Sequence, residues 1–300
     1  MSFNNIIGNK EVKELLSKSI EQNNILHSYL FLGIEGIGKS LFAKQFAKMI
    51  LCQNDVKPCN SCKSCIEFEN NNNPDFVIIS NDEKVIKIDQ IRDMNRRISE
   101  KPITSNKKVY IINNSDTMTK EAQNSLLKTL EEPPEYAVII LIASNENKLL
   151  NTIRSRTIKI NFNKLKYEEL LEYVEKNNIE ALKNNMLQFS DGSIAKVLKI
   201  KENEENYLQI ENLINNLDKK NLIYILNNSE VLYKAKEEIY DILEYINVLL
   251  RNTKDIEKIN CIKYVEEAKR RLSSSSNYDM TIDNLLIKMW EEINEKDSRC

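Results

Sequence analysis

The chain has 300 residues, enough for about two domains with real hydrophobic cores, so a single small module is excluded. With 41% hydrophobic and 29% charged residues and a net charge of −2, it is an ordinary globular chain, neither a disordered tail nor a protein held to nucleic acid by overall positive charge. The longest apolar run, 137–143, is too short to span a membrane, and the first residues have no apolar signal core. We therefore expect a cytoplasmic protein with no membrane partner.

The first half of the chain predicts alternating helices and buried strands. Apolar residues at helical spacing predict helices over 10–22, 40–51, 88–98 and 120–130. Short apolar runs predict strands over 28–32, 76–79, 109–112 and 138–143, with 157–160 as a weaker fifth. Helices that alternate with fully apolar strands predict a parallel sheet covered on both faces.

The second half predicts helices only. The strand pattern ends near residue 162, and after Pro134 the only glycine or proline is Gly192. Between 239 and 250, apolar residues recur every three or four positions, which places them on one face of a helix. The serine run 273–276 predicts a linker.

The stretch 33–40, GIEGIGKS, has the phosphate-loop pattern between a predicted strand and a predicted helix. Its glycines let backbone N–H groups turn toward phosphate oxygens, its lysine reaches the β and γ phosphates, and its serine can bind Mg²⁺. The candidate nucleotide-binding residues are Gly33, Gly36, Gly38, Lys39 and Ser40. The alternative is a glycine turn that binds no nucleotide.

ATP hydrolysis needs acidic residues as well, usually an Asp at the end of a neighbouring strand for Mg²⁺ and a second acid that orients water. The strand 109–112 ends instead in Asn113 and Asn114, whose neutral amides bind Mg²⁺ weakly and cannot act as a base. Asp116 follows three residues after Asn113, about 10 Å away in an extended chain, so we expect it to point elsewhere. The pattern predicts nucleotide binding with little or no turnover.

Four of the six cysteines fall within one short stretch: Cys52, Cys59, Cys62 and Cys65. Four thiolates at these spacings can close a tetrahedral zinc site, and because no ligand position stays open the metal would be structural. An iron–sulfur cluster or free thiols are the alternatives. His27 is then a packing or hydrogen-bonding residue, and Cys261 and Cys300 are left unpaired.

Five stretches together resemble the clamp-loader subunits of bacterial DNA polymerase III, a branch of the AAA+ proteins. They are the phosphate loop, the four cysteines, HSYLF at 27–31, NSLLKTLEEPP at 124–134 and TIRSR at 152–156. The resemblance implies an α/β RecA-like AAA+ domain over 1–163 with a zinc module at 52–65. It also implies a small helical lid over 164–205 and an all-α collar domain over 206–300.

Where the chain departs from the pattern of the motor subunits, it resembles the delta-prime branch of the family. Motor subunits carry an acidic pair where this chain has Asn113 and Asn114, and an arginine where Ala195 stands in GSIA. The resemblance implies a non-motor, stator-like subunit with weak or absent ATPase activity of its own, within a polymerase (nucleotidyltransferase) holoenzyme. The alternative is an active AAA+ clamp-loader motor.

The resemblance also implies residue roles and partners. Arg156 would be an arginine finger that acts in trans on a neighbouring ATPase subunit, although without the motif it would be interpreted as a solvated or DNA-facing charge. Ser144 falls where the family has a phosphate sensor, and Thr157 replaces a common cysteine. The partners would be the motor ATPase subunits and the clamp-opening subunit in a hetero-oligomeric ring that uses ATP to load the sliding clamp onto primer–template DNA.

Two more distant functions are a phosphoryl-transfer enzyme and a zinc-bearing DNA-binding module. The first would need an acidic residue that activates an acceptor, and the sequence assigns none. The second is disfavoured by the net charge and by the lack of aromatic residues among the basic residues near the cysteines.

Overall fold

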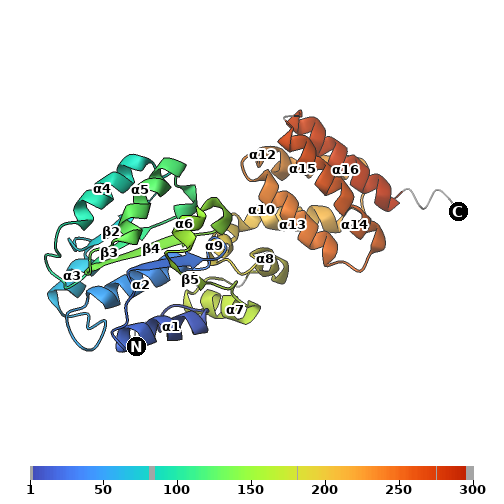
Figure 1. Cartoon of the computed structure of the whole chain (residues 1–300). Coiled ribbons are helices and arrows are strands. Elements are labelled where there is room, and N and C mark those ends of the chain that lie inside the picture. Colours follow the sequence, from blue (N-terminus) through green and yellow to red (C-terminus); the bar gives the residue numbers. More distant parts are fainter. Residues whose placement is uncertain (1–2, 81–84, 181, 275, 295–300) are drawn as a thin grey trace. The chain divides into compact units, whose positions relative to one another are not determined.

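The computed structural model describes residues 3–80, 85–180, 182–274 and 276–294. The chain divides into two compact units, Met1–Tyr173 and Val174–Cys300 (Figure 1). The first unit is an α/β unit, and the second contains only helices within the described residues. None of the described helices is long and apolar enough to cross a membrane.

A five-stranded parallel sheet forms the centre of the first unit. Its strands are β1 (Ser28–Leu32), β2 (Phe76–Ile79), β3 (Lys108–Ile112), β4 (Ala137–Ala143) and β5 (Ile158–Asn161). Their order in the sheet is β2-β3-β4-β1-β5, and every pairing is parallel. The five predicted strands are confirmed to within one residue at each end. Because all strands run in the same direction, the sheet has one amino edge and one carboxyl edge.

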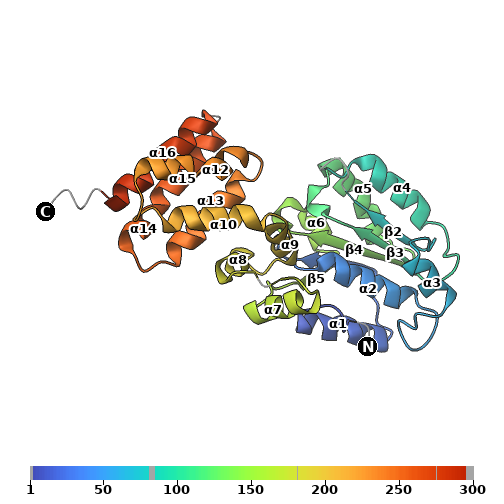
Figure 2. The ribbon, with the colours of Figure 1, turned by 180° about the vertical axis from the view of Figure 1, so that it is seen from behind.

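Helices cover both faces of this sheet. One face is covered by α4 (Ile88–Ile98) and α5 (Lys120–Glu131), and the other by α1 (Lys10–Glu21) and α2 (Lys39–Leu51) (Figures 1 and 2). Shorter elements complete the unit: α3 (Lys63–Glu69), η1 (Ser115–Thr117), η2 (Glu146–Lys148) and α6 (Asn151–Arg154). The helix α7 (Tyr167–Lys176) contains the boundary between the two units. The helix α3 begins directly after Cys62 and contains Cys65, and it was not predicted from the sequence.

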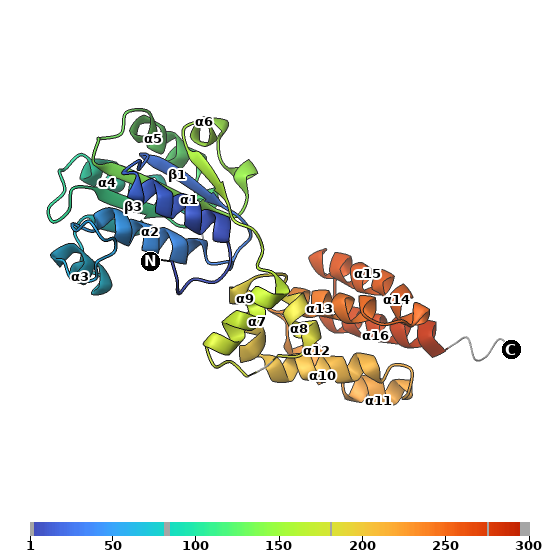
Figure 3. The same cartoon turned by 90° about the horizontal axis from the view of Figure 1, so that it is seen from below.

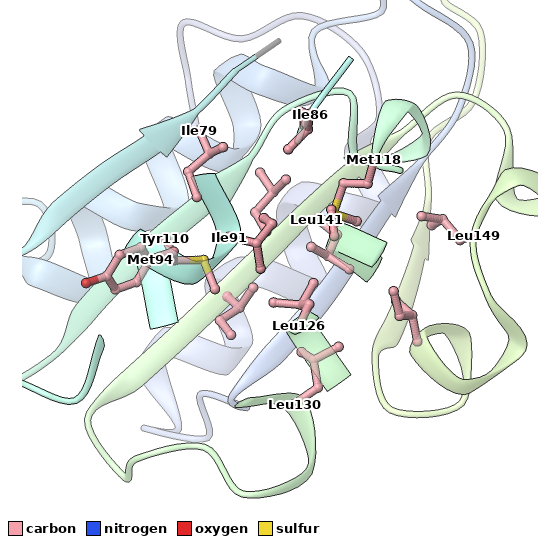
Figure 4. Close-up of a cluster of buried hydrophobic side chains, with 14 of the residues drawn as sticks. Ile79, Ile86, Ile91, Met94, Tyr110, Met118, Leu126, Leu130, Leu141 and Leu149 are labelled. Atoms are coloured by element: carbon pink, nitrogen blue, oxygen red, sulfur yellow. The ribbon is translucent and has the colours of Figure 1, made fainter. Parts of the chain in front are cut away.

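The core under α4 and α5 follows directly from their apolar spacing. Ile91 and Met94 of α4 and Leu126 of α5 are buried against Tyr110 of β3 and Leu141 of β4 (Figure 4). On a helix, residues three or four apart share a face, and on a strand every second side chain points to the same side of the sheet. Ala122 and Leu130, near the two ends of α5, are buried in the same cluster, so both ends of the helix are held against the sheet.

Aromatic side chains fill the core on the opposite face. The rings of Phe42 in α2 and Phe31 in β1 each lie 5.1 Å from the ring of Phe162, and Phe46 lies 5.3 Å from Tyr29. These contacts hold the start of α2 against the end of β1. The loop between the two elements is therefore anchored on both sides.

The second unit is a helical bundle (Figure 3). Its helices are α8 (Asn184–Phe189), α9 (Ile194–Glu202), α10 (Glu204–Asn215), α11 (Leu222–Asn227), α12 (Glu230–Lys234), α13 (Ile239–Arg251), α14 (Ile256–Asn260), α15 (Ile262–Ser273) and α16 (Tyr278–Asn294). The helix predicted over 239–250 is α13, and its apolar face is buried. The first residue of the predicted linker, Ser273, is the last residue of α15; Ser274 and Ser276 lie between α15 and α16, and Ser275 lies outside the described residues. The boundaries of a lid over 164–205 and a collar over 206–300 stay a prediction.

Candidate functional sites at the two edges of the sheet

The phosphate loop joins the end of β1 to the start of α2 at the carboxyl edge. Gly36 and Gly38 have positive φ angles of 79° and 91°, a backbone conformation that glycine adopts without strain. A Cβ on Gly33 would lie 2.7 Å from both the Ile37 side chain and the Phe162 carbonyl oxygen, so this position has no room for a side chain. Gly36 and Gly38 are thus required by the backbone conformation and Gly33 by the lack of space for a side chain, and all three determine the shape of the loop.

Lys39 is the first residue of α2 and is only 6% exposed. Its ammonium donates hydrogen bonds to the carbonyl oxygens of Gly33 (2.6 Å) and Ile34 (2.7 Å). Burial lowers the pKa of Lys39, while the negative charges of Asp116 and Glu35 act in the opposite direction. A buried ammonium beside a helix N-terminus fits a phosphate group, which would offer it a charged partner. Ser40 follows, half-buried, in the first turn of α2.

The residues after β3 approach the same loop. Asn113 and Asn114 directly follow the last residue of β3, as predicted, and Asn114 turns the chain with a positive φ of 50° into η1. Asp116 therefore does not extend away as expected: its carboxylate accepts the backbone N–H groups of Ser144 (3.3 Å) and Asn145 (2.9 Å), just beyond β4. Its charge also acts on Lys39. Asp116 thus stands near the loop, where the strand tip itself has only neutral amides.

Arg156 lies at the amino edge, in the turn between α6 and β5. The hydroxyl of Ser28, the first residue of β1, donates to the Arg156 carbonyl oxygen at 2.6 Å. The Arg156 side chain is 35% exposed and forms an ion pair with Glu131, with 2.8 Å between Nη2 and Oε1. Its Nη1 donates to the Thr152 carbonyl oxygen at 3.0 Å and to the Ser155 hydroxyl at 3.4 Å.

A cavity of about 430 Å³ opens beside Arg156. Its lining residues belong to three separate motifs of the sequence or directly adjoin them: Leu26, His27, Ser28, Leu130, Glu131, Ser155, Arg156, Thr157 and Ile158. His27 is exposed there, and its carbonyl oxygen accepts the backbone N–H of Ile139. The structure therefore brings together HSYLF, LEEPP and TIRSR, which lie far apart in the sequence.

Sequence reasoning did not single out Ser28 and Glu131 as neighbours of Arg156. A signal was present for Glu131, because an acidic residue in the last turn of a helix is disfavoured by the helix dipole. The partner could not be deduced, since the contact depends on how α5 and α6 pack against the sheet.

The four cysteines of the module at 52–65 converge. Their Sγ atoms all lie within 4.8 Å of one another, with Cys52 and Cys65 buried and Cys59 and Cys62 half-buried. Hydrogen bonds from Ser61 and from the Cys62 backbone N–H lower the pKa of the Cys59 thiol to about 5, whereas burial raises the pKa of Cys65 to about 12. Four sulfur donors in this arrangement fit a closed structural zinc site.

Buried polar residues fasten this module to the sheet. Ser64 lies between two of the cysteines, and its hydroxyl is 2.8 Å from that of Ser105. Asp75, 1% exposed, accepts backbone N–H groups from Ile103, Thr104 and Ser105 at 2.7–2.8 Å. The module is thus continuous with the start of β2 through hydrogen bonds that the sequence alone did not indicate.

The remaining singled-out residues lie elsewhere. Ser193 caps α9 and Ala195 is exposed in its first turn. Cys261 is buried in the second unit, and Cys300 falls outside the described residues.

The sheet order, the phosphate loop after β1 and the helices on both faces define a RecA-like AAA+ domain, followed here by a helical region. Residues 8–166, more than half of the chain, match the family described as DNA polymerase III, delta subunit, and the chain belongs to that family.

Two relatives from Bacillus subtilis (strain 168) illustrate the similarity. DNA polymerase III subunit delta′ is 34% identical over 195 residues, which cover 65% of this chain and 59% of that protein. DNA polymerase III subunit tau is 30% identical over 278 residues, 86% of this chain and 47% of that protein. The matched region thus spans less than two thirds of either relative's own length. Among solved structures, a gamma subunit-related protein of Thermotoga maritima aligns with a TM-score of 0.48 at 18% identity, covering 93% of this chain and 99% of that one.

Proposed function

We propose that this chain is a non-motor, stator-like subunit of a DNA polymerase III clamp loader, and that it supplies Arg156 in trans to the ATPase site of a neighbouring subunit. One observation carries the proposal: Arg156 and the chain's own phosphate loop lie at opposite edges of the sheet. The carbonyl of Arg156 is bound at the first residue of β1, and the loop begins after the last.

The length of β1 separates these two sites. Its five residues, at about 3.3 Å each, put roughly 16 Å between Ser28 and Gly33, farther than one arginine side chain reaches. Arg156 therefore cannot serve the loop of its own chain. In a ring of such subunits nucleotide sits at the interfaces, and an arginine from the adjacent subunit that stabilises the charge on the transferred phosphate contributes roughly 10³- to 10⁵-fold in rate.

The carboxyl edge supports the non-motor role. The amides of Asn113 and Asn114 stand where hydrolysis requires carboxylates, so we expect this chain to bind ATP with Mg²⁺ but to turn it over at background rate. Lys39 would hold the phosphates and Ser40 the Mg²⁺. Zinc held by the four cysteines would brace the module after α2 without taking part in chemistry.

The wider role follows from the family. The partners would be motor ATPase subunits and a clamp-opening subunit in a cytoplasmic hetero-oligomeric ring, which uses ATP to load the sliding clamp onto primer–template DNA. The chain itself would act there as a rigid partner and not as a motor.

Steady-state ATP hydrolysis by the purified chain, run beside a nucleotide-binding titration in the same Mg²⁺ buffer, tests the non-motor role. We expect nucleotide binding through the loop and turnover at background. Robust turnover by the isolated chain would make it a motor, with Asp116 or another carboxylate completing its site.

A further inference from the structure

Glu131 occupies an unfavourable position for a carboxylate. It is the last residue of α5, because Pro133 cannot continue a helix and disfavours helical backbone at Glu132 just before it. A negative charge at a helix C-terminus faces the negative end of the helix dipole, so the helix itself gains nothing from it. The favourable partner of this carboxylate is the guanidinium of Arg156, 2.8 Å away.

The position of Glu131 is itself well fixed. The preceding residue, Leu130, is 1% exposed and packs in the core beneath α5 (Figure 4). The carboxylate is therefore presented from the rigid end of a packed helix, and not from a loop.

Arg156 is held both at its backbone and at its guanidinium. Its carbonyl is bound by Ser28, and its guanidinium contacts Glu131, Thr152 and Ser155. A guanidinium has five N–H donors in a planar fork, so these three contacts leave donors for a phosphate.

From this arrangement we infer that Glu131 is a positioning residue, which fixes the guanidinium of Arg156 in the orientation it needs to meet a phosphate on the neighbouring subunit. The inference rests on the proposed function of Arg156. A half-exposed arginine has many rotamers, and holding it in one before the phosphate arrives removes that ordering cost from the reaction. LEEPP and TIRSR then form one functional unit, in which the first motif orients the arginine of the second.

Glu132 provides a matched control. It has the same charge, is the next residue, and is exposed at the end of the same helix. Exposed ion pairs contribute little to folding stability, so neither Glu131→Gln nor Glu132→Gln should change the melting temperature measurably. Differences in rate can then be attributed to the arginine.

The test is ATP turnover by the clamp-loader complex assembled from this full-length chain and its neighbouring ATPase subunits. We expect Glu131→Gln to lower kcat by roughly 10-fold with KM for ATP unchanged, and Glu132→Gln to leave both unchanged. Arg156→Ala should cost more, and adding Glu131→Gln to Arg156→Ala should cost nothing further, because Glu131 acts only through the arginine.

Each other outcome overturns a different statement. Full activity of Glu131→Gln beside a slow Arg156→Ala would show that the ion pair does not position the arginine. A further loss in the double variant would show that Glu131 acts by another route. Full activity of Arg156→Ala would remove the arginine finger, and this inference with it.

Discussion

The two edges of the sheet differ in the functional groups that they carry. The carboxyl edge has an intact phosphate loop with a buried Lys39, but neutral amides stand at the tip of β3. The amino edge presents Arg156 with its backbone and its guanidinium both held. In the function proposed above, the carboxyl edge binds nucleotide without the groups for cleavage, and the amino edge carries Arg156, which the length of β1 keeps away from the chain's own loop.

Under the proposed function, this difference corresponds to a division of chemistry between subunits. A site that is incomplete within one chain can be complete at an interface, where the loop comes from one subunit and the arginine from the next. Because about 16 Å of strand separates the edges, substitutions at one should leave the other unaffected. The effect of a substitution at one edge can therefore be measured separately from the function of the other edge.

Loss of the metal from the cysteine module should affect both edges of the sheet, because the module belongs to neither edge. We expect about one zinc per chain by elemental analysis, and Cys65→Ser should release it and destabilise the first unit by on the order of 3–5 kcal/mol, about 10 °C in melting temperature. Both edges should then lose function together. Cys261→Ser, buried in the second unit, should retain the metal. Iron absorbance, or a Cys65→Ser chain that keeps its metal, would contradict the closed zinc site.

Lys39→Ala tests the carboxyl edge alone. A charge-assisted hydrogen bond to phosphate contributes about 1.5–3 kcal/mol, so nucleotide affinity of the isolated chain should fall roughly 10- to 100-fold by titration calorimetry. Arg156→Ala should bind nucleotide like the unmodified chain. If the arginine variant also lost affinity, the two edges would not be independent.

Asp116→Asn tests whether the carboxylate near the phosphate loop contributes to binding of the Mg²⁺–nucleotide complex. Mg²⁺ prefers carboxylate oxygens, and the charge of Asp116 acts on Lys39, so affinity for the Mg²⁺–nucleotide complex should fall about 5-fold. Affinity for nucleotide in EDTA should stay equal or rise, because a negative charge has been removed near the phosphates. An equal loss with and without Mg²⁺ would mean that Asp116 only holds the backbone at Ser144.

Alkaline pH gives the smallest expected effect. Burial lowers the pKa of Lys39, so the free chain loses this positive charge at a lower pH than an exposed lysine does. Only the charged form attracts phosphate strongly, and affinity should therefore decline several-fold as the pH rises through the lowered pKa. Titrations at increasing pH, with circular dichroism as a check on folding, measure this. A flat profile up to the ordinary lysine pKa would contradict it.

The strands and the larger helices of the first unit could be predicted because their patterns are local. Apolar runs such as 138–143 identify buried strands, and the spacing of Ile91 and Met94 identifies a helix face. The helix α3 was missed because it has seven residues, too few to show a period.

The candidate sites divide in the same way. The phosphate loop and the cysteine cluster each consist of consecutive or closely spaced residues, so both could be predicted from the sequence. The prediction that Asp116 points away from the loop was wrong, because it assumed an extended chain after Asn113 and the chain turns at Asn114. The contact between Glu131 and Arg156 joins residues 25 apart through the packing of α5 and α6, and no local pattern contains it.

The central claim is that this chain's arginine acts on its neighbour's nucleotide. The most direct measurement is ATP turnover by the assembled complex containing either the unmodified chain or Arg156→Ala, with assembly checked by size-exclusion chromatography. We expect an Arg156→Ala complex that assembles normally and hydrolyses ATP about 10³-fold more slowly. Normal turnover by an assembled Arg156→Ala complex would contradict it.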